Sequence, residues 1–291
     1  MSNELLRYLY HRLLHSDSAK LGCDAHYSDG LIAFMFLYAA LSDRSPHWAV
    51  NKKVWPLWCQ RLKFPSYSQF NRRLKTAAVQ KVIQMVNSEC REKLPHSQEK
   101  FLDGKPEVVG GYSKDPDARG GHIPDGWGKG YKVHVFADKT GAIDAFEVTA
   151  LDAGEPTVAR RLIENIDLKG VVVRADNNYD SNKLYKDVAD RGGRLIAPRK
   201  KPGKGIGHHP QHPDRLRAIR ELEGDSSIMK DHCRQRASVE RTLALLTNLP
   251  FGLAPLPNFV RRLQRVKRWV AAKITLYHLY CSLSLEKRLA A

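Results

Sequence analysis

Two aspartates stand where an apolar segment of the chain gives way to polar residues. Asp176 ends the run VVVRAD, and Asp103 ends the run KFLD. In a mixed α/β sheet the carboxyl ends of neighbouring strands meet at one edge, so two such aspartates come to lie close together. Like charges at that distance repel each other unless a divalent cation lies between them. The sequence therefore predicts a cation site of hard oxygen ligands, although an aspartate that merely caps a turn is a simpler alternative for Asp176.

A helical segment further along the chain supplies a third acid. The stretch RQRASVER contains Glu240, and Arg236 lies four residues earlier on the same helical face. A third carboxylate would complete a two-metal site, whereas a plain surface ion pair is the alternative interpretation. Other candidates for the first acid position are Asp115, Asp138 and Asp144. We favour Asp103, because Asp138 ends a strand that should lead into a hairpin turn.

The elements that must position these acids follow one another in an informative order. Alternating and apolar runs predict a strand ending near Asp103, a hairpin over 130–150, and a strand over 171–176. Helical spacing predicts helices over 155–166 and 181–189, and a short strand follows near 194–200. This order predicts an α/β fold, a ribonuclease H-like mixed sheet with helices on both of its faces.

The first 97 residues have helical spacing and almost no strand signal, which predicts a small all-α domain before a catalytic domain over 98–291. Within it, Ser66 is placed to cap a helix whose polar side carries three basic residues. Such a helix either reads DNA within a helix-turn-helix or is an ordinary amphipathic helix. The residues of that basic side are Arg72, Arg73 and Lys75.

The charge of the chain points to a polyanionic partner. Lys and Arg number 48 against 31 Asp and Glu, so the formal charge is 48 − 31 = +17, and nucleic acid is the leading candidate.

A long helix is predicted over 258–285, with an apolar stripe that faces a core. Its basic side either contacts the DNA backbone or is solvated. The members of that side are Arg261, Arg262, Arg265, Lys267 and Arg268.

Several classes of protein are disfavoured. The five cysteines are scattered without a C-x-x-C pair, which indicates a reducing compartment rather than a disulfide framework. The apolar run over 30–41 is too short to cross a bilayer, so it predicts a buried helix, and no membrane partner is expected.

A loop rich in Gly, Pro, Lys and His follows residue 199. Its histidines lack acidic partners at ligand spacing, so phosphate contacts or solvation are favoured over a metal site. These are His208, His209 and His212.

Four stretches of the sequence, taken in order, resemble successive motifs of a known enzyme family. They are LDGKPEVVGGYSKDPDARGG, GKGYKVHV, ADNNYDSNKLY and RQRASVER. Together they resemble the DDE transposases encoded by bacterial insertion sequences, and the resemblance covers about residues 100–270. The chain departs from the family's arginine-glutamate helix motif at two positions. Cys233 stands where the fuller motif has tyrosine, and Thr247 where it has lysine.

The resemblance implies a ribonuclease H-like catalytic domain in which Asp103, Asp176 and Glu240 chelate two Mg²⁺ ions, with Mn²⁺ as a substitute. Arg236 would contact a phosphate or orient Glu240. The implied activity is cleavage and joining of the ends of an insertion sequence. The implied partners are double-stranded DNA, at the element ends and the target, and a second copy of the chain in the DNA complex, in the bacterial cytoplasm and nucleoid. A DNA-binding relative that does not cut, and a nuclease such as a junction resolvase, are the alternatives.

Overall fold

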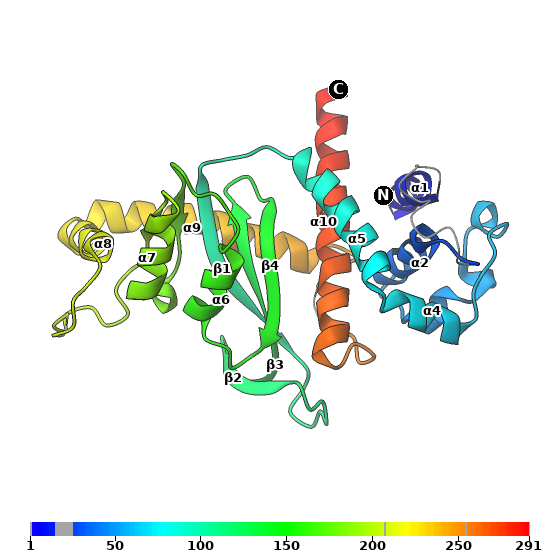
Figure 1. Cartoon of the computed structure of the whole chain (residues 1–291), viewed down its shortest axis with the longest axis horizontal. Helices are drawn as coiled ribbons and strands as arrows, with labels where there is room; N and C mark the ends of the chain where they lie inside the picture. Colours follow the sequence, from blue (N-terminus) through cyan, green and yellow to red (C-terminus); the bar gives the residue numbers. More distant parts are fainter. Residues whose placement is uncertain (1, 15–25, 207, 254, 291) are drawn as a thin grey trace. The chain divides into compact units, whose positions relative to one another are not determined.

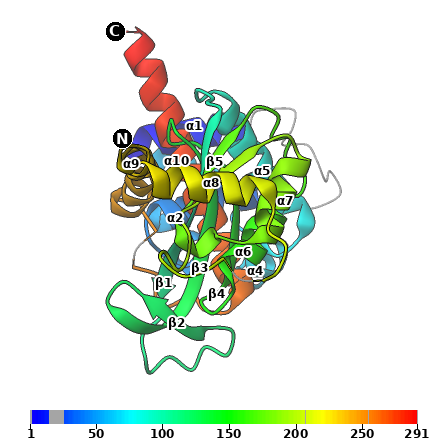
Figure 2. The ribbon, with the colours of Figure 1, turned by 90° about the vertical axis from the view of Figure 1, so that its left-hand side faces the viewer.

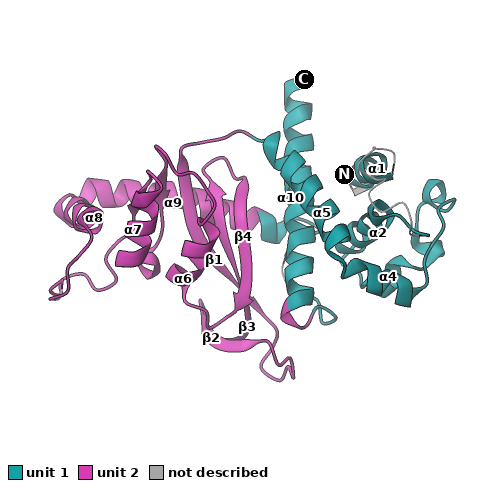
Figure 3. Cartoon of the chain, in the orientation of Figure 1, with its two compact units in different colours: residues 1–94, 246–260, 264–291 teal, residues 95–245, 261–263 magenta. Residues whose placement is uncertain are grey.

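The computed structural model describes residues 2–14, 26–206, 208–253 and 255–290, and the chain forms two compact units (Figure 3). Unit 1 comprises residues 1–94, 246–260 and 264–291, and unit 2 comprises residues 95–245 and 261–263. The C-terminal residues 264–291 group with the N-terminal helices in unit 1.

Unit 1 is helical and is built around α2 (Asp29–Leu41), the helix expected from the apolar run. Nearly every residue of α2 is buried, because α1, α3, α4 and α5 contact it on several sides. No helix in the described part of the chain is both long and apolar enough to span a membrane. The other elements of this unit are α1 (Ser2–Leu14), α3 (Pro46–Ala49), short 3₁₀ turns at Lys52–Val54 and Leu57–Cys59, α4 (Tyr67–Leu74), α5 (Ala77–Glu92) and α10 (Leu263–Ala290).

The C-terminal helix α10 belongs to unit 1 because its middle is buried there. Trp269 packs edge-on against Phe36 of α2, with ring centroids 6.4 Å apart. Lys273 is only 1% exposed, and its ammonium group donates to the carbonyl of Ala40 at 2.7 Å. A buried cation needs such partners, so this lysine ties α10 to the end of α2. Spacing along α10 alone predicts an apolar stripe but does not reveal which elements cover it.

The short helix α4 begins where the sequence predicts. Ser66 accepts a hydrogen bond from the backbone N–H of Gln69, and the Gln69 side chain accepts one from the N–H of Ser66. This reciprocal capping box satisfies two backbone donors that the first helical turn leaves free. The start of α4 is therefore set locally, by two residues three positions apart.

Unit 2 contains one mixed sheet with β1 at its centre (Figure 1). β1 pairs with β3 in antiparallel register and with β5 in parallel register, and β6 continues the parallel part. On the other side of β3, β2 and β4 pair with successive parts of that long strand. The strands are β1 (Glu99–Val108), β2 (Arg119–Ile123), β3 (Gly126–Asp138), β4 (Ile143–Ala150), β5 (Val172–Arg174) and β6 (Arg194–Ile196).

Helices cover both faces of this sheet, as the sequence predicts. α6 (Glu155–Leu162) lies on one face, and the unit 2 part of α9 (Ser226–Asn248) lies on the other (Figure 1). α7 (Asn182–Asp190) and α8 (Pro213–Gly224) both contact β6, and α8 crosses that end of the sheet in Figure 2. The core under α6 and α7 contains Leu102 of β1 and Val173 of β5.

Three elements differ from the expectation. β1 continues beyond Asp103 to Val108, so Asp103 lies within the strand, just past the part that pairs with β5. β2 was not predicted, because its glycine-rich sequence lacks alternation. α8 was not predicted either, because its charged sequence follows a loop rich in Gly and Pro and exposes much of its surface.

A buried ion pair closes the end of the sheet where β1 begins. Asp138 is fully buried, and its carboxylate accepts hydrogen bonds from the Lys100 ammonium group and the backbone N–H of Ser97, both at 2.7 Å. Burial favours the neutral acid, but the Lys100 hydrogen bond and the N–H groups of Thr140 and Ser97 outweigh it and lower the pKa of Asp138. Asp138 is thus a structural residue.

We expect Asp138→Asn to lower the free energy of unfolding by about 1–3 kcal/mol at pH 7, because Lys100 keeps Asp144 as a partner but loses one of its two carboxylates. The lowered pKa means that the contribution of Asp138 is present above the unfolded pKa of about 3.9 and is lost as the pH falls through the folded value. Urea unfolding at pH 7 and at acid pH measures both effects. The exposed Asp167→Asn is the control, and equal stability of the two variants would contradict the structural role.

Candidate active site

The parallel pairing of β1 and β5 brings Asp103 and Asp176 to one edge of the sheet. Phe101 of β1 is the register partner of Arg174 of β5, and each aspartate follows its strand partner by two residues. Asp176 is fixed at the start of the 3₁₀ turn Asn177–Tyr179, where it accepts the backbone N–H of Asn178 at 2.8 Å. It caps that turn, which is the simpler of the two interpretations that the sequence left open for Asp176.

Each of the two carboxyl groups lies in the field of the other acids. Burial first, and the charges of Asp176 and Glu155 to a smaller extent, raise the pKa of Asp103 to about 6, against the Gly104 N–H and Arg236, which lower it. The pKa of Asp176 is also raised, by burial first and by Glu155 second. Mutual repulsion in a partly buried place is the expected signature of carboxylates arranged for a cation.

The helix α9 carries Arg236 and Glu240 near this edge. The charge of the Arg236 guanidinium group lowers the pKa of both aspartates. The same group lies 3.9 Å from the Glu240 carboxylate. The Glu240 side chain is 62% exposed, whereas that of Arg236 is 20% exposed. The structure thus brings Asp103, Asp176 and Arg236 together and leaves Glu240 one helical turn away, at the surface.

Glu155 is a fourth acid at this site, and sequence reasoning missed it. It is the first residue of α6 and pairs with Lys132 of β3 at 2.7 Å. Both side chains lie over Gly104, where an added Cβ would approach the Glu155 carboxylate to 3.3 Å and Lys132 to 3.1 Å. A glycine directly after Asp103 therefore makes room for this pair. The available signal is the acid at the first position of the helix predicted over 155–166.

Tyr179 completes the wall behind the acids. It is 1% exposed, and its hydroxyl group finds no hydrogen-bond partner among the described residues. Burial raises the pKa of Tyr179, and Glu155, Asp103 and Asp176 raise it further.

The donor chemistry of this edge fits a hard divalent cation. Carboxylate oxygens are the ligands preferred by Mg²⁺ and Mn²⁺, and a cation beside Asp103 and Asp176 would offset the burial and the like charges that raise their pKa values. Among the described residues, no three His, Cys, Asp or Glu side chains already stand close enough to hold a metal. Completion of the site therefore requires a side-chain movement, and the exposed Glu240 is free to make one.

A groove of about 400 Å³ opens beside these acids. Trp127, at the start of β3, is 69% exposed at its rim, and Lys132 and Lys200 add positive charge. Asn178 and Glu155 line it on the side of the acids. Basic groups with an exposed aromatic ring are the features expected of a surface that contacts a nucleic acid strand.

The competing acids have structural partners instead. Asp138 lies opposite Lys100 because β3 runs antiparallel to β1, so its strand ends at the edge of the sheet away from Asp103. Asp144 also pairs with Lys100, at 2.7 Å. Asp115 is buried, and it accepts the Tyr131 hydroxyl at 2.6 Å and the backbone N–H of Arg262 at 2.9 Å.

The basic residues expected to bind DNA fall into two groups. Arg73 forms an ion pair with Asp29 at 2.6 Å, so it holds α4 against α2. Exposed side chains make up the other group, namely Arg72, Lys75, Arg262 and Arg265, while Arg261 is partly buried. Arg262 has a backbone φ of 73°, which is unusual for a residue with a side chain. Its N–H bond to Asp115 stabilises that conformation.

The histidine loop shows no metal site among its described residues. His208 and His209 are exposed. His212 caps α8, because its Nδ1 atom accepts the backbone N–H of Asp214. In the described structure, two of these histidines are therefore solvated and the third caps a helix.

We expect Asp103→Asn to raise the free energy of unfolding of the metal-free protein by about 1–3 kcal/mol at pH 8. The raised pKa means that Asp103 contributes stability below the unfolded pKa and loses it as the pH rises through about 6, so the gain of the variant should vanish near pH 4. Unfolding in EDTA at both pH values measures this. A loss of stability at pH 8, relative to Asp167→Asn, would show that the carboxylate is a structural anchor.

Three comparisons with known proteins bear on this site. A sequence profile described as the transposase DDE domain matches residues 97–279. No curated protein matches the chain. A piggyBac transposase, solved by cryo-EM in a synaptic complex with hairpin DNA, has a similar structure, with a TM-score of 0.52 at 12% identity over 89% of this chain and 67% of that one. At this identity the likeness concerns the fold. Since the profile covers more than half of the sequence, the chain belongs to the DDE transposase family, whose members cleave and transfer DNA strands with divalent metal ions.

Proposed function

We propose that Asp103, Asp176 and Glu240 chelate Mg²⁺ in the cleavage and transfer of DNA strands at the ends of an insertion sequence. One observation carries this proposal: Asp103 and Asp176 share an edge of the sheet, and Arg236, beside them, lies 3.9 Å from Glu240. A side-chain rotation of Glu240, which is mostly exposed, would add its carboxylate to the other two. The arrangement joins two rigid ligands from the sheet with one adjustable ligand from a helix.

The roles of the protein groups follow from their positions. A bound divalent cation supplies charge neutralisation for the phosphate that is attacked. Asp103 and Asp176 are held by a strand and a capped turn, so they orient the ligand oxygens without a further entropy cost. Arg236 is placed to hold Glu240 or to contact a phosphate oxygen, because its charge attracts all three acids.

Glu155 and Lys132 position the site rather than react. Their ion pair covers Gly104 and faces the groove, so Lys132 can exchange Glu155 for a DNA phosphate when a strand enters. Released from Lys132, Glu155 is free to accept a hydrogen bond or to join the cation's outer ligands. Mg²⁺ is the expected physiological ion, because it is bound through few carboxylates and retains waters that the groove can accommodate.

The proposed assembly is a homodimer on DNA at the element ends, in the bacterial nucleoid. A charge of +17 gives the protein a long-range attraction for duplex DNA of any sequence. Base contacts must then supply the preference for the element's own ends, and the exposed Arg72 and Lys75 of the α4 region are candidates for them.

The test is strand cleavage on a duplex that carries the element's ends. Asp103→Asn, Asp176→Asn and Glu240→Gln should each lower cleavage by about a thousandfold or more and leave DNA binding nearly unchanged, since the lost interaction acts mainly in the transition state. Mg²⁺ and Mn²⁺ should both support cleavage, and EDTA should abolish it. The exposed Asp167→Asn and Glu164→Gln are the matched controls.

Two results would contradict the assignment. Normal cleavage by Glu240→Gln together with inactive Glu155→Gln would move the third ligand to α6. Equal cleavage in EDTA and in Mg²⁺ would remove the metal mechanism altogether. Asp138→Asn is unsuitable as a control here, because the loss of its buried ion pair affects folding.

Variants in the α4 region distinguish residues that bind DNA from a residue that stabilises the fold. Arg72→Ala and Lys75→Ala should weaken binding to the element's ends, by about 1–3 kcal/mol for a lost base contact and less for a lost phosphate contact, without changing stability. Arg73→Ala should instead lower the free energy of unfolding by about 2 kcal/mol, because Asp29 is left buried without its cation. Anisotropy titrations and urea unfolding measure the two effects. If Arg72→Ala and Lys75→Ala bind normally, α4 has no role in recognition.

A further inference from the structure

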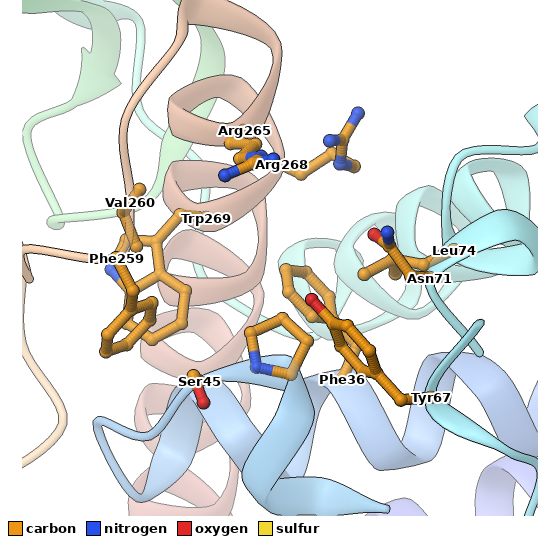
Figure 4. A pocket seen from close by; sticks show the side chains of 11 residues that line it. Phe36, Ser45, Tyr67, Asn71, Leu74, Phe259, Val260, Arg265, Arg268 and Trp269 are labelled. Atoms are coloured by element: carbon orange, nitrogen blue, oxygen red, sulfur yellow. The ribbon is translucent and has the colours of Figure 1, made fainter. Parts of the chain in front are cut away.

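Unit 1 contains an aromatic pocket that the proposed catalytic function does not use (Figure 4). It has a volume of about 140 Å³ and lies between α4, α10 and the segment before α10. Phe259 and Trp269 stand on one side, and Tyr67 and Phe36 on the other. This cavity is smaller than the roughly 300–1,000 Å³ of pockets for drug-sized ligands, so it suits a single planar ring.

Two guanidinium groups stand at this pocket. Arg265 and Arg268 both line it, and neither pairs with a carboxylate among the described residues. Burial lowers the pKa of Arg268, and the like charge of Arg265 lowers it further. They also lie in the first two turns of α10, where the positive end of the helix dipole disfavours cations. An anion at the mouth of the pocket would pair with both arginines, favour the charged form of Arg268 and offset the positive end of the helix dipole.

Polar groups add further recognition capacity within the same pocket. The indole N–H of Trp269 is buried without a hydrogen-bond partner in the described part of the chain. The Asn71 amide, from α4, lies at the side of Tyr67 (Figure 4). A planar ring with polar edges that is attached to an anion can stack on the aromatic side chains, form a hydrogen bond with the amide and pair with the two arginines. A nucleotide has this combination, whereas an apolar side chain of another protein would leave both arginines unpaired.

We propose that this pocket binds an unstacked base of DNA, with the adjacent phosphate held by Arg265 and Arg268. The base enters between Tyr67 and Phe259, and the Asn71 amide faces its edge. In intact duplex the base must first leave the stack, which costs a few kcal/mol and costs less at a strand end or a nick. The pocket therefore favours single-stranded or frayed DNA over intact duplex. The inference uses only the family's DNA partner and does not depend on the proposed metal ligands.

The test is a photochemical cross-link in EDTA, with a single strand of thymidylates in which one base is 5-bromodeoxyuridine. The full chain should cross-link at Tyr67 or Phe259, and Asp103→Asn should do the same. The cross-link is therefore expected even if the proposed metal ligands are wrong. Tyr67→Ala should lower affinity for the strand by about tenfold, because a stacked base contributes roughly 1–3 kcal/mol. Arg265→Ala and Arg268→Ala should each reduce the slope of log affinity against log salt by about 0.7.

Arg288→Ala is the matched control, because it removes the same charge from an exposed position at the far end of α10. A lower salt slope in the pocket variants but not in Arg288→Ala supports the proposal. Cross-links confined to the groove around Trp127, or equal effects of all three arginine variants, would overturn it. It would also be overturned if the pocket variants changed only the monomer–dimer equilibrium, because the occupant would then be a second copy of the chain.

Discussion

The parallel pairing of β1 with β5 is the constraint on which the rest of unit 2 depends. Only Glu99–Phe101 and Val172–Arg174 form it, yet it carries Asp103 and Asp176 to one edge of the sheet. The burial of these two carboxyl groups opposes folding, as their raised pKa values indicate. The apolar core under α6 and α7 must offset that cost, which explains why so apolar a strand leads to an acid.

The parts of this fold that could be predicted from sequence are those specified locally. The run VVVRAD has the β-branched residues of a buried strand, and Ser66 has its capping partner three residues away. The order of strands and helices then indicated the mixed sheet, and the resemblance of four motifs indicated the DDE transposase family. Elements without a local pattern were missed: β2 is rich in glycine, and α8 exposes much of its charged surface.

The roles of individual charged residues depend on contacts between distant parts of the chain. Glu155 looked like an ordinary helix start, and only the packing of α6 beside β3 places it near Lys132 and the two aspartates. Arg73 looked equivalent to Arg72, but the fold sets Asp29 beside it alone. A net charge of +17 cannot distinguish arginines with internal partners from arginines that remain available to DNA.

The helix α10 shows how a fold can retain charges that oppose its stability. Arg265 lies in the first turn of α10, where the positive end of the helix dipole costs a cation about 0.3–1 kcal/mol, and burial and the charge of Arg265 both disfavour the charge on Arg268. Further along, Lys273 is hydrogen-bonded to Ala40, and the His278 ring bonds the Asn87 side chain at 2.9 Å. Because these buried contacts anchor the helix at its middle, its first turns need not add stability. They can carry arginines that lack a carboxylate partner among the described residues and that pair, in our proposal, with a DNA phosphate.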